Sequence, residues 1–308
     1  MSPDAQALLL SPGALALLGL LVGSFLNVVV HRVPQMLERG WWGDVGSQLG
    51  DRASFERVFG QSAPGEVQQA AALLQTRVET LPALDLVKPA SRCPACGHRI
   101  RWFENIPVLS WLALRARCSA CGSPISARYP LVELACAGLF GAIAWRLGPQ
   151  PATLLWCAVG AVLLAASLID WDTTLLPDGL TVPLAWGGLL AAACGWTVPL
   201  HTAVVGAVAG YLSLWSVYWL FKLATGKEGM GYGDFKLLAA LGAWLGWEAI
   251  LPVVLMASLT GAVVGLFMKL MGQLREGRYV PFGPFLAAGG LGVLLLGLPR
   301  VLGFMGWR

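Results

Sequence analysis

The chain has 308 residues, of which 56% are hydrophobic and only 12% are charged. A soluble domain carries about 25% charged residues, so this composition excludes an ordinary soluble protein. Long apolar runs alternate with short polar segments, which is the pattern of a helical protein that crosses a membrane several times. The formal net charge of +4 adds little, because the cytoplasmic loops of such proteins are generally basic.

Hydropathy predicts eight membrane spans, at residues 7–30, 129–147, 152–170, 179–197, 202–223, 235–246, 248–271 and 283–304. The sixth is short for a bilayer that requires about 20 helical residues, so we expect it to form a half-helix or to pair with the seventh. The predicted fold is an all-α polytopic membrane protein with about eight transmembrane helices. Its expected parts are a first transmembrane helix at 1–31, a cytoplasmic loop domain at 32–128 and a transmembrane helical core at 129–308.

Lysine and arginine residues set the expected orientation, because loops on the cytoplasmic side of a membrane are enriched in them. If the N-terminus lies outside, only three of the 21 basic residues fall outside: Arg146, Arg300 and Arg308. The inside set includes Arg275 and Arg278. The first apolar run has no basic residue before it and no clear small-residue cleavage site after it, so we expect a retained helix rather than a cleaved signal peptide.

Four of the seven cysteines form two Cys-x-x-Cys pairs, Cys93 with Cys96 and Cys118 with Cys121. This spacing predicts a zinc ribbon at 93–121, with four thiolate ligands in a tetrahedral site. Two disulfides are disfavoured in a reducing cytoplasm, whereas a bound metal would help to fold a loop that has little core. The alternative is two turns with unrelated thiols, or a ribbon that has lost its metal.

Arginines surround this ribbon at positions 92, 99, 101, 115 and 117. Such a basic surface suits anionic lipid headgroups, and it also suits nucleic acid. We expect the lipid bilayer as the partner and no nucleic acid, because the loop joins two membrane spans.

Small residues recur along the predicted helices in patterns that favour close packing. Gly19, Gly23, Asn27 and His31 share one face of the first span, which indicates either helix packing with hydrogen bonds or the lining of a wet site. The pairs Gly206/Gly210 and Gly261/Gly265 also predict packing. Residues 36–90 are polar and irregular apart from one amphipathic helix expected over 66–81.

Asp170 ends the apolar run 163–169. A carboxylate at membrane depth is costly and by default marks a functional site. Asp172 faces away from Asp170 if the helix continues, and it lies further into the loop. Asp178 follows a proline and precedes the fourth span, where it is expected to cap the helix N-terminus. Asp170 is therefore the catalytic candidate of the three.

A second acid, Asp234, follows Gly231 and Gly233 and opens a hydrophobic helix. The two glycines permit positive φ or close backbone approach, so a substrate strand could lie against them. Two carboxylates that share one proton are what aspartyl proteolysis requires, because one takes a proton from water and the other protonates the carbonyl oxygen. We predict Asp170 and Asp234 as the catalytic pair, with Gly231, Gly233 and Lys236 in support. Lys236 could instead form a plain salt bridge with Asp234.

Taken together, these features resemble the type IV prepilin peptidases, bifunctional membrane enzymes with a Gly-x-Gly-Asp aspartyl protease motif. The residues that carry the resemblance extend over nearly the whole chain: Gly23–Arg32, the four cysteines, Asn105–Pro107, Arg128–Glu133, Ile169-Asp170, Leu176–Asp178 and Gly229–Lys236. Two departures stand out. Ala116 occupies a position that is often glycine in the family, and residues 36–90 are longer than in many members.

The resemblance implies a bacterial inner-membrane enzyme with a periplasmic N-terminus, serving type IV pilus or type II secretion systems. Such enzymes remove the basic leader of type IV prepilins and pseudopilins after a glycine at the cytoplasmic face. They then methylate the new N-terminal residue with S-adenosylmethionine, an activity associated with the zinc-bearing loop. The residues that bind the methyl donor are not identified, although Glu133 is a candidate for binding an amine or for capping its helix.

Two other functions fit parts of the sequence. Intramembrane acids and small-residue stripes also suit a transporter or channel, although no inverted repeat is visible. A membrane scaffold whose ribbon binds a partner is the third hypothesis, and it requires neither aspartate.

Overall fold

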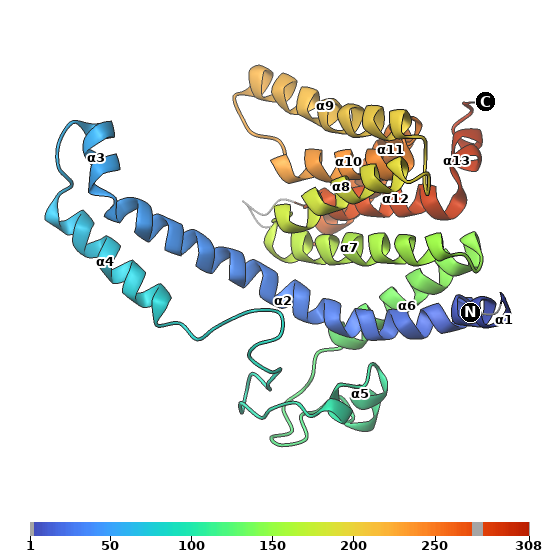
Figure 1. Cartoon of the computed structure of the whole chain (residues 1–308), viewed down its shortest axis with the longest axis horizontal. Coiled ribbons are helices and arrows are strands. Elements are labelled where there is room, and N and C mark those ends of the chain that lie inside the picture. The colour runs from blue at the N-terminus through green and yellow to red at the C-terminus, as the bar shows by residue number, and fades with distance from the viewer. Residues whose placement is uncertain (1–2, 273–279, 308) are drawn as a thin grey trace.

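The computed structural model describes residues 3–272 and 280–307, and this part of the chain is all-helical, with no β-strand (Figure 1). The helices are α1 (Pro3–Leu9), α2 (Pro12–Gly50), α3 (Arg52–Phe59), α4 (Gly65–Glu79), α5 (Leu109–Ala113), α6 (Arg128–Leu147), α7 (Pro151–Thr173), α8 (Asp178–Ala193), α9 (Leu200–Thr225), α10 (Tyr232–Leu245), α11 (Ile250–Leu270), α12 (Gly283–Leu296) and α13 (Leu298–Phe304). Short 3₁₀ turns cover Trp102–Asn105 and Trp247–Ala249.

The long apolar helices fit a multi-pass membrane protein. Five stretches are long and apolar enough to cross a membrane: α2, α6, α7, α9 and Trp247–Leu270. The bent pair α12–α13, with an angle of 106°, makes a sixth if it counts as one span. The predicted number of eight is not confirmed, because α8 and α10 have only 16 and 14 residues. Of the basic residues used to orient the chain, Arg275, Arg278 and Arg308 lie outside the described residues.

The first long helix does not end near residue 31 but continues to Gly50, so the expectation that residues 36–90 are irregular apart from one helix is wrong. Asp51 closes α2 and opens α3, because its carboxylate accepts a hydrogen bond from the Ser54 N–H at 3.1 Å. The predicted helix over 66–81 is confirmed as α4. The second half of α2 is polar, so hydropathy did not indicate that the helix continues.

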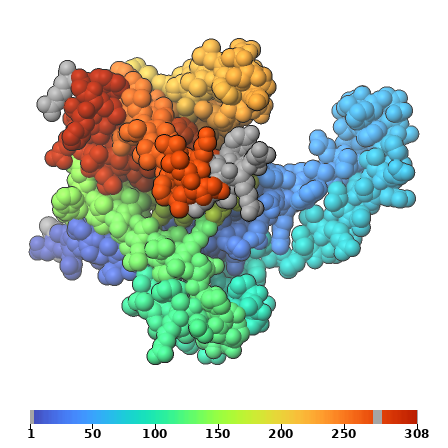
Figure 2. All heavy atoms as spheres, turned by 180° about the vertical axis from the view of Figure 1, so that it is seen from behind, coloured from blue at the N-terminus to red at the C-terminus, as the bar shows by residue number. Residues whose placement is uncertain are grey.

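The far half of α2, together with α3 and α4, forms an arm that extends away from the helical body (Figures 1 and 2). Helix α4 packs back on α2, where a Cβ added to Gly46 would lie 3.2 Å from Gln75 Cγ. The returning chain is fixed to α2 by the buried Arg32, whose guanidinium donates to the carbonyls of Asp85 at 2.8 Å and Pro89 at 2.6 Å.

The small-residue stripe of α2 packs against α6. A Cβ on Gly19 would lie 2.7 Å from Ala137 Cα, and one on Gly23 would lie 2.7 Å from Glu133 Cα. The Asn27 amide donates to the Tyr129 carbonyl at 3.2 Å. These contacts confirm the packing interpretation of the stripe.

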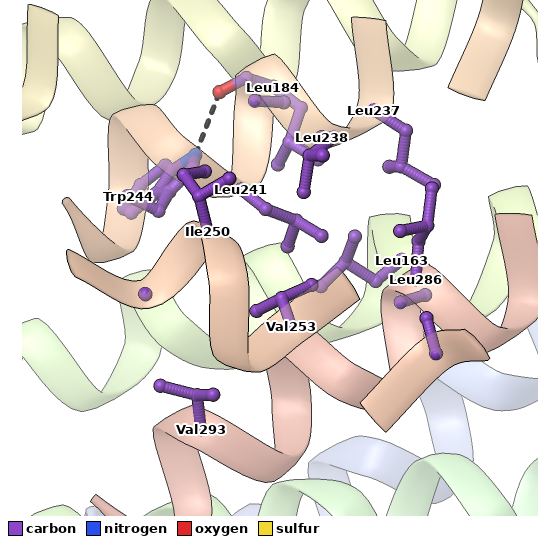
Figure 3. Packing of buried hydrophobic residues seen from close by; sticks show 14 of the residues in the cluster. Leu163, Leu184, Leu237, Leu238, Leu241, Trp244, Ile250, Val253, Leu286 and Val293 are labelled. Atoms are coloured by element: carbon purple, nitrogen blue, oxygen red, sulfur yellow. Dashed lines mark hydrogen bonds between the residues drawn. The ribbon is translucent and has the colours of Figure 1, made fainter. Parts of the chain in front are cut away.

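The hydrophobic core of the C-terminal half surrounds α10 (Figure 3). Most residues of α10 are buried, including Leu237, Leu238 and Leu241, and the Trp244 indole donates to the Leu184 carbonyl of α8 at 2.7 Å. A helix that is hydrophobic on nearly all sides belongs in such a core. This burial fixes the first turn of α10, which carries Asp234.

The predicted packing role of the glycine pairs is confirmed where α9 crosses α10. A Cβ on Gly210 would lie 2.5 Å from the Leu238 carbonyl oxygen, and one on Gly206 would overlap the Gly242 carbonyl. In the second pair, Gly261 lies against the Phe285 ring, at 3.2 Å from an added Cβ.

Replacing Gly206 by alanine is expected to lower the stability of the protein by about 1–3 kcal/mol, because the added methyl group has no space against the α10 backbone. Thermal unfolding of the detergent-solubilised protein measures the effect. Gly138→Ala is the control, because no atom lies within 4 Å of a Cβ built there. Equal melting temperatures for the two variants would contradict the packing described here.

Candidate functional site

Asp170 and Asp234 come together at one end of the helical bundle. Asp170 lies in the last turn of α7 and Asp234 in the first turn of α10, and the two residues are only 5% and 6% exposed. The two carboxyl groups are near neighbours in the fold. Leu176, from the α7–α8 connection, packs between the starts of α10 and α12, because Cβ atoms added to Gly233 and Gly283 would lie 2.6 Å and 3.0 Å from its side chain. The structure thus brings together the two acids that the sequence singled out.

Asp170 is held by a backbone group that sequence reasoning missed. The Gly283 N–H, at the start of α12, donates to Asp170 Oδ2 at 3.0 Å. A Cβ on Gly283 would lie 2.5 Å from the same oxygen, so only glycine fits this close approach. The available signal was a glycine between Phe282 and Pro284, ahead of an apolar helix.

Asp234 has the opposite environment. Its Oδ1 atom is buried and has no hydrogen-bond partner among the described residues. An unpaired buried polar atom costs about 1–3 kcal/mol, so such an atom is rare and calls for a reason. An oxygen in this state is available to a water molecule or to a polar group of a substrate.

The two glycines before Asp234 differ in role. Gly231 is extended, with φ −82° and ψ 153°, and a Cβ there would meet no atom closer than 4.0 Å. Neither Gly231 nor Gly233 has a positive φ. Close packing is seen at Gly233 alone, where the Leu176 side chain of the same protein lies in the place of a side chain, and the approach of a substrate strand stays a prediction.

The neighbouring charged residues pair with one another rather than with the two buried acids. Lys236 Nζ lies 2.6 Å and 2.8 Å from the carboxylate oxygens of Asp178, so the alternative of a Lys236–Asp234 salt bridge is wrong. Pro177 takes the N-cap position of α8, so the capping role expected of Asp178 is also wrong. The pair instead joins the N-terminal ends of α8 and α10.

Asp172 faces away from the acid pair, as predicted. Its carboxylate accepts two hydrogen bonds from the guanidinium of Arg128, at 2.8 Å and 2.5 Å. The Asp172 side chain is 31% exposed, which leaves it in a much wetter environment than Asp170.

A cluster on α9 fixes the loop before Asp234. Lys222 Nζ lies 2.9 Å from Glu228 Oε1 and 3.2 Å from the Tyr218 hydroxyl. The buried Tyr218 ring packs against Tyr232 and Phe235, at centroid distances of 5.4 Å and 5.7 Å. These two rings flank Asp234 in sequence, so the cluster positions the turn that carries it.

The four predicted metal ligands form a second site, separate from the acids. The Sγ atoms of Cys93, Cys96, Cys118 and Cys121 all lie within 4.8 Å of one another and could bind a metal ion. The two turns that hold them are alike, because the N–H groups of Gly97 and Gly122 each donate to the first cysteine carbonyl of their pair at 2.9 Å. Each of these glycines has a φ of +72°, which glycine adopts without strain.

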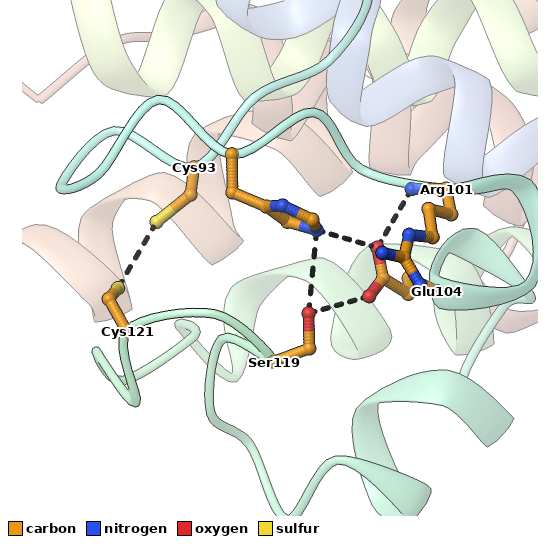
Figure 4. A network of polar contacts seen from close by, with 6 residues as sticks. Cys93, Arg101, Glu104, Ser119 and Cys121 are labelled. Atoms are coloured by element: carbon orange, nitrogen blue, oxygen red, sulfur yellow. Dashed lines mark hydrogen bonds and ion pairs between the residues drawn. The ribbon is translucent and has the colours of Figure 1, made fainter.

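A polar network joins the two halves of the ribbon (Figure 4). Glu104 accepts hydrogen bonds from the Arg101 N–H at 2.8 Å and from the Ser119 hydroxyl at 2.6 Å, and it lies 3.2 Å from the His98 ring. The backbone N–H of Arg101, together with the Ser119 hydroxyl, lowers the pKa of Glu104 to about 2. Glu104 is therefore ionised at neutral pH and connects the residues around both cysteine pairs.

Ala116 in this loop and Glu133 in the adjoining helix α6 differ from simple expectation. Ala116 has a φ of +58°, a left-handed conformation that suits glycine better, and this is where the chain departs from the common family pattern. Glu133 is buried in α6 and accepts a hydrogen bond from the Val108 N–H at 2.7 Å. Glu133 therefore fastens the loop to the helical body.

The fold and the two sites describe a multi-pass membrane protein with a buried acid pair and a four-cysteine loop. Residues 17–147 match the bacterial peptidase A24 N-terminal domain, and residues 157–266 match the type IV leader peptidase family. The chain belongs to the type IV leader peptidase family, and the resemblance seen in its sequence is confirmed.

Curated relatives cover nearly the whole chain. A prepilin leader peptidase/N-methyltransferase of Burkholderia pseudomallei (strain 1026b) is 49% identical over 92% of this chain and 85% of its own length. Proteins of the same name from Aeromonas hydrophila and Pseudomonas aeruginosa are each 50% identical, over 91% of this chain and 89% of their own length. No solved structure matches the chain.

Proposed function

We propose that the protein removes the basic leader of type IV prepilins and pseudopilins after a glycine and then methylates the new N-terminal residue. The observation that carries the proposal is the meeting of two buried carboxylates, Asp170 and Asp234, in a chain of this family. The names of its relatives support both activities. We place the enzyme in a bacterial inner membrane, with a periplasmic N-terminus and the acid pair at the cytoplasmic face.

Cleavage would use the two carboxyl groups in different roles. The ionised group takes a proton from a water molecule, whose oxygen attacks the carbonyl carbon of the scissile peptide bond. The protonated group donates its proton to the carbonyl oxygen. The tetrahedral intermediate then collapses as the proton taken from water passes to the leaving nitrogen, and the amine is released. The unpaired Oδ1 of Asp234 is available for such a contact, whereas the Gly283 N–H already holds one oxygen of Asp170.

The location of the pair also suits the substrate. Its cationic leader would be attracted to carboxylates at the membrane surface, and its apolar helix would lie among the spans. Burial of that helix would then set which peptide bond reaches the acids.

Asp170→Asn and Asp234→Asn are each expected to reduce leader cleavage at least about 100-fold, because each removes one partner of the proton transfer. The measurement is the cleavage of a prepilin in membranes, detected by the decrease in its length. Asp172→Asn is the control, because Asp172 pairs with Arg128 and points away from the pair. Normal processing by either of the first two variants would count against the proposal.

Gly283→Ala is expected to impair cleavage strongly while the protein still inserts, because the new methyl group would displace the Asp170 carboxylate. Gly179→Ala is the matched control near the same end of the bundle, since nothing lies within 4 Å of a Cβ built there. Initial cleavage rates of the two variants should differ clearly. Equal rates would mean that the Gly283 contact does not position Asp170.

The cysteine cluster fits the zinc that we propose for it. Four sulfurs at about 2.3 Å from a tetrahedral zinc are separated by about 3.8 Å. The Cys93 and Cys121 sulfurs lie 3.9 Å apart, close to that separation. Cys93, Cys96, Cys118 and Cys121 would hold the ion, which would supply folding energy to the loop rather than chemistry at the acid pair.

For the second activity, S-adenosylmethionine would supply the methyl group that the new amine accepts. We propose that the ribbon-bearing loop serves this step. In this structure one oxygen of Glu133 already accepts the Val108 N–H, so this residue holds the loop to α6.

Replacing Cys93 and Cys96 by serine is expected to remove the bound zinc and reduce methylation while cleavage continues, because the acid pair lies elsewhere in the fold. Zinc content of the purified protein and the N-terminal mass of the mature pilin are the readouts. Cys194→Ser is the control, because Cys194 is exposed and lies outside the cluster. Methylation at the normal level in the zinc-free variant would show that the ribbon has another role.

A further inference from the structure

The segment between the two cysteine pairs exposes an unusual number of large apolar side chains. They are Trp102, Phe103, Ile106, Leu109 and Leu112, with Trp102 81% and Leu109 65% exposed. Leu109 and Leu112 are spaced three apart on the short helix α5, so they share one face, and Ile106 lies just before that helix. A patch of this kind in water marks an interaction surface.

The depth of this segment is set by its contact with α6. Val108 donates to Glu133, which lies five residues inside α6 and thus about 7 Å along the helix from its start at Arg128. Glu133 packs in turn against Gly23 of α2, and five of the next seven residues of α2, as far as Val30, are apolar. The segment therefore lies level with the ends of the membrane spans rather than out in the cytosol.

The figures agree with this depth. In Figure 1, α5 lies beside the region where α2 and α6 cross, whereas the arm of α3 and α4 extends far from the body. In Figure 2, the loop forms a bulge on the side of the body, well away from the tip of the arm.

The charges around the patch have one sign. Arg99, Arg101, Arg115 and Arg117 are exposed, and within the described residues none of them forms an ion pair with a carboxylate. Glu104 is the only acid between Arg92 and Cys121, and it is already used inside the ribbon. A cationic rim around an apolar face matches a leaflet that contains anionic phospholipid.

We propose that residues 102–114 insert into the interface of the leaflet on the acid-pair side, with the four arginines binding anionic phospholipid headgroups. The loop is then a membrane-anchored element rather than a free cytoplasmic domain. A second copy of the chain or another protein would also cover an apolar face, but neither would explain the depth fixed by Glu133. The proposal depends on the membrane-spanning helices and not on either proposed activity.

The test is lipid photolabelling of the full-length wild-type protein, reconstituted in vesicles whose phospholipids carry a diazirine on the acyl chain. Mass spectrometry of the peptides compares three regions in one sample. Leu131 on α6, which is 62% exposed, provides the reference for lipid contact. Val58 and Phe59 on α3, which are 70% and 62% exposed, provide the control for exposed apolar residues on the arm.

We expect label on residues 106–112 close to that on Leu131 and several-fold above that on Val58 and Phe59. Leu109→Gln combined with Leu112→Gln should remove the label from the segment and leave it on Leu131, which reports an intact bundle. Label on the segment no higher than on the arm would overturn the proposal. If label on the segment falls as the protein concentration rises, a second copy of the chain covers the segment. That result would also overturn the proposal.

The headgroup part is tested in the same assay with phosphatidylcholine vesicles, with and without phosphatidylglycerol. Label on the segment should increase several-fold with phosphatidylglycerol. The increase should be lost when Arg99 and Arg115 are replaced by glutamine. An equal signal in both vesicles, or an unchanged increase in that variant, would refute the role of the arginines.

Discussion

The structure depends on placing two carboxyl groups, Asp170 and Asp234, side by side inside an apolar helical bundle. Such burial is costly unless the surrounding elements fix both groups. Helix α7 ends one turn after Asp170, where Thr174 adopts a left-handed conformation and its N–H donates to the Asp170 carbonyl at 2.8 Å. Helix α10 is buried on nearly all sides, and Leu176 occupies the space that Gly233 and Gly283 leave open. The absence of side chains at these two glycines is thus as important as the acids themselves.

The acid pair and the ribbon are separate, yet α6 connects them. The ribbon leads directly into α6, and Arg128 at the start of that helix pairs with Asp172, two residues from Asp170. Glu133, one turn further, holds the Val108 N–H. The two proposed activities would therefore share one rigid helix while their chemistry stays apart, which suits an enzyme that acts first on a peptide bond and then on the amine it releases.

Sequence reasoning found the features that are recognisable from the type and spacing of side chains. Three patterns could be recognised before the tertiary structure was known. They are the acids at the end of apolar runs, the two cysteine pairs and the small residues at helical spacing. The continuation of α2 to Gly50 could not be foreseen, because its far half carries polar residues and several glycines and is stabilised by packing on α4. The Gly283 N–H was missed because a backbone donor has no side-chain signature. The partner of Lys236 lies 58 residues away on α8, and only the tertiary fold selects it over the nearby Asp234.

The central claim is that both acids reach one reacting group. The most direct measurement is a structure of the protein bound to a prepilin whose scissile bond is replaced by a hydroxyethylene group, which mimics the tetrahedral intermediate. The account predicts that the hydroxyl group lies within hydrogen-bond distance of both Asp170 and Asp234. A bound peptide whose hydroxyl contacts only one carboxylate, with the other turned away or paired elsewhere, would contradict it.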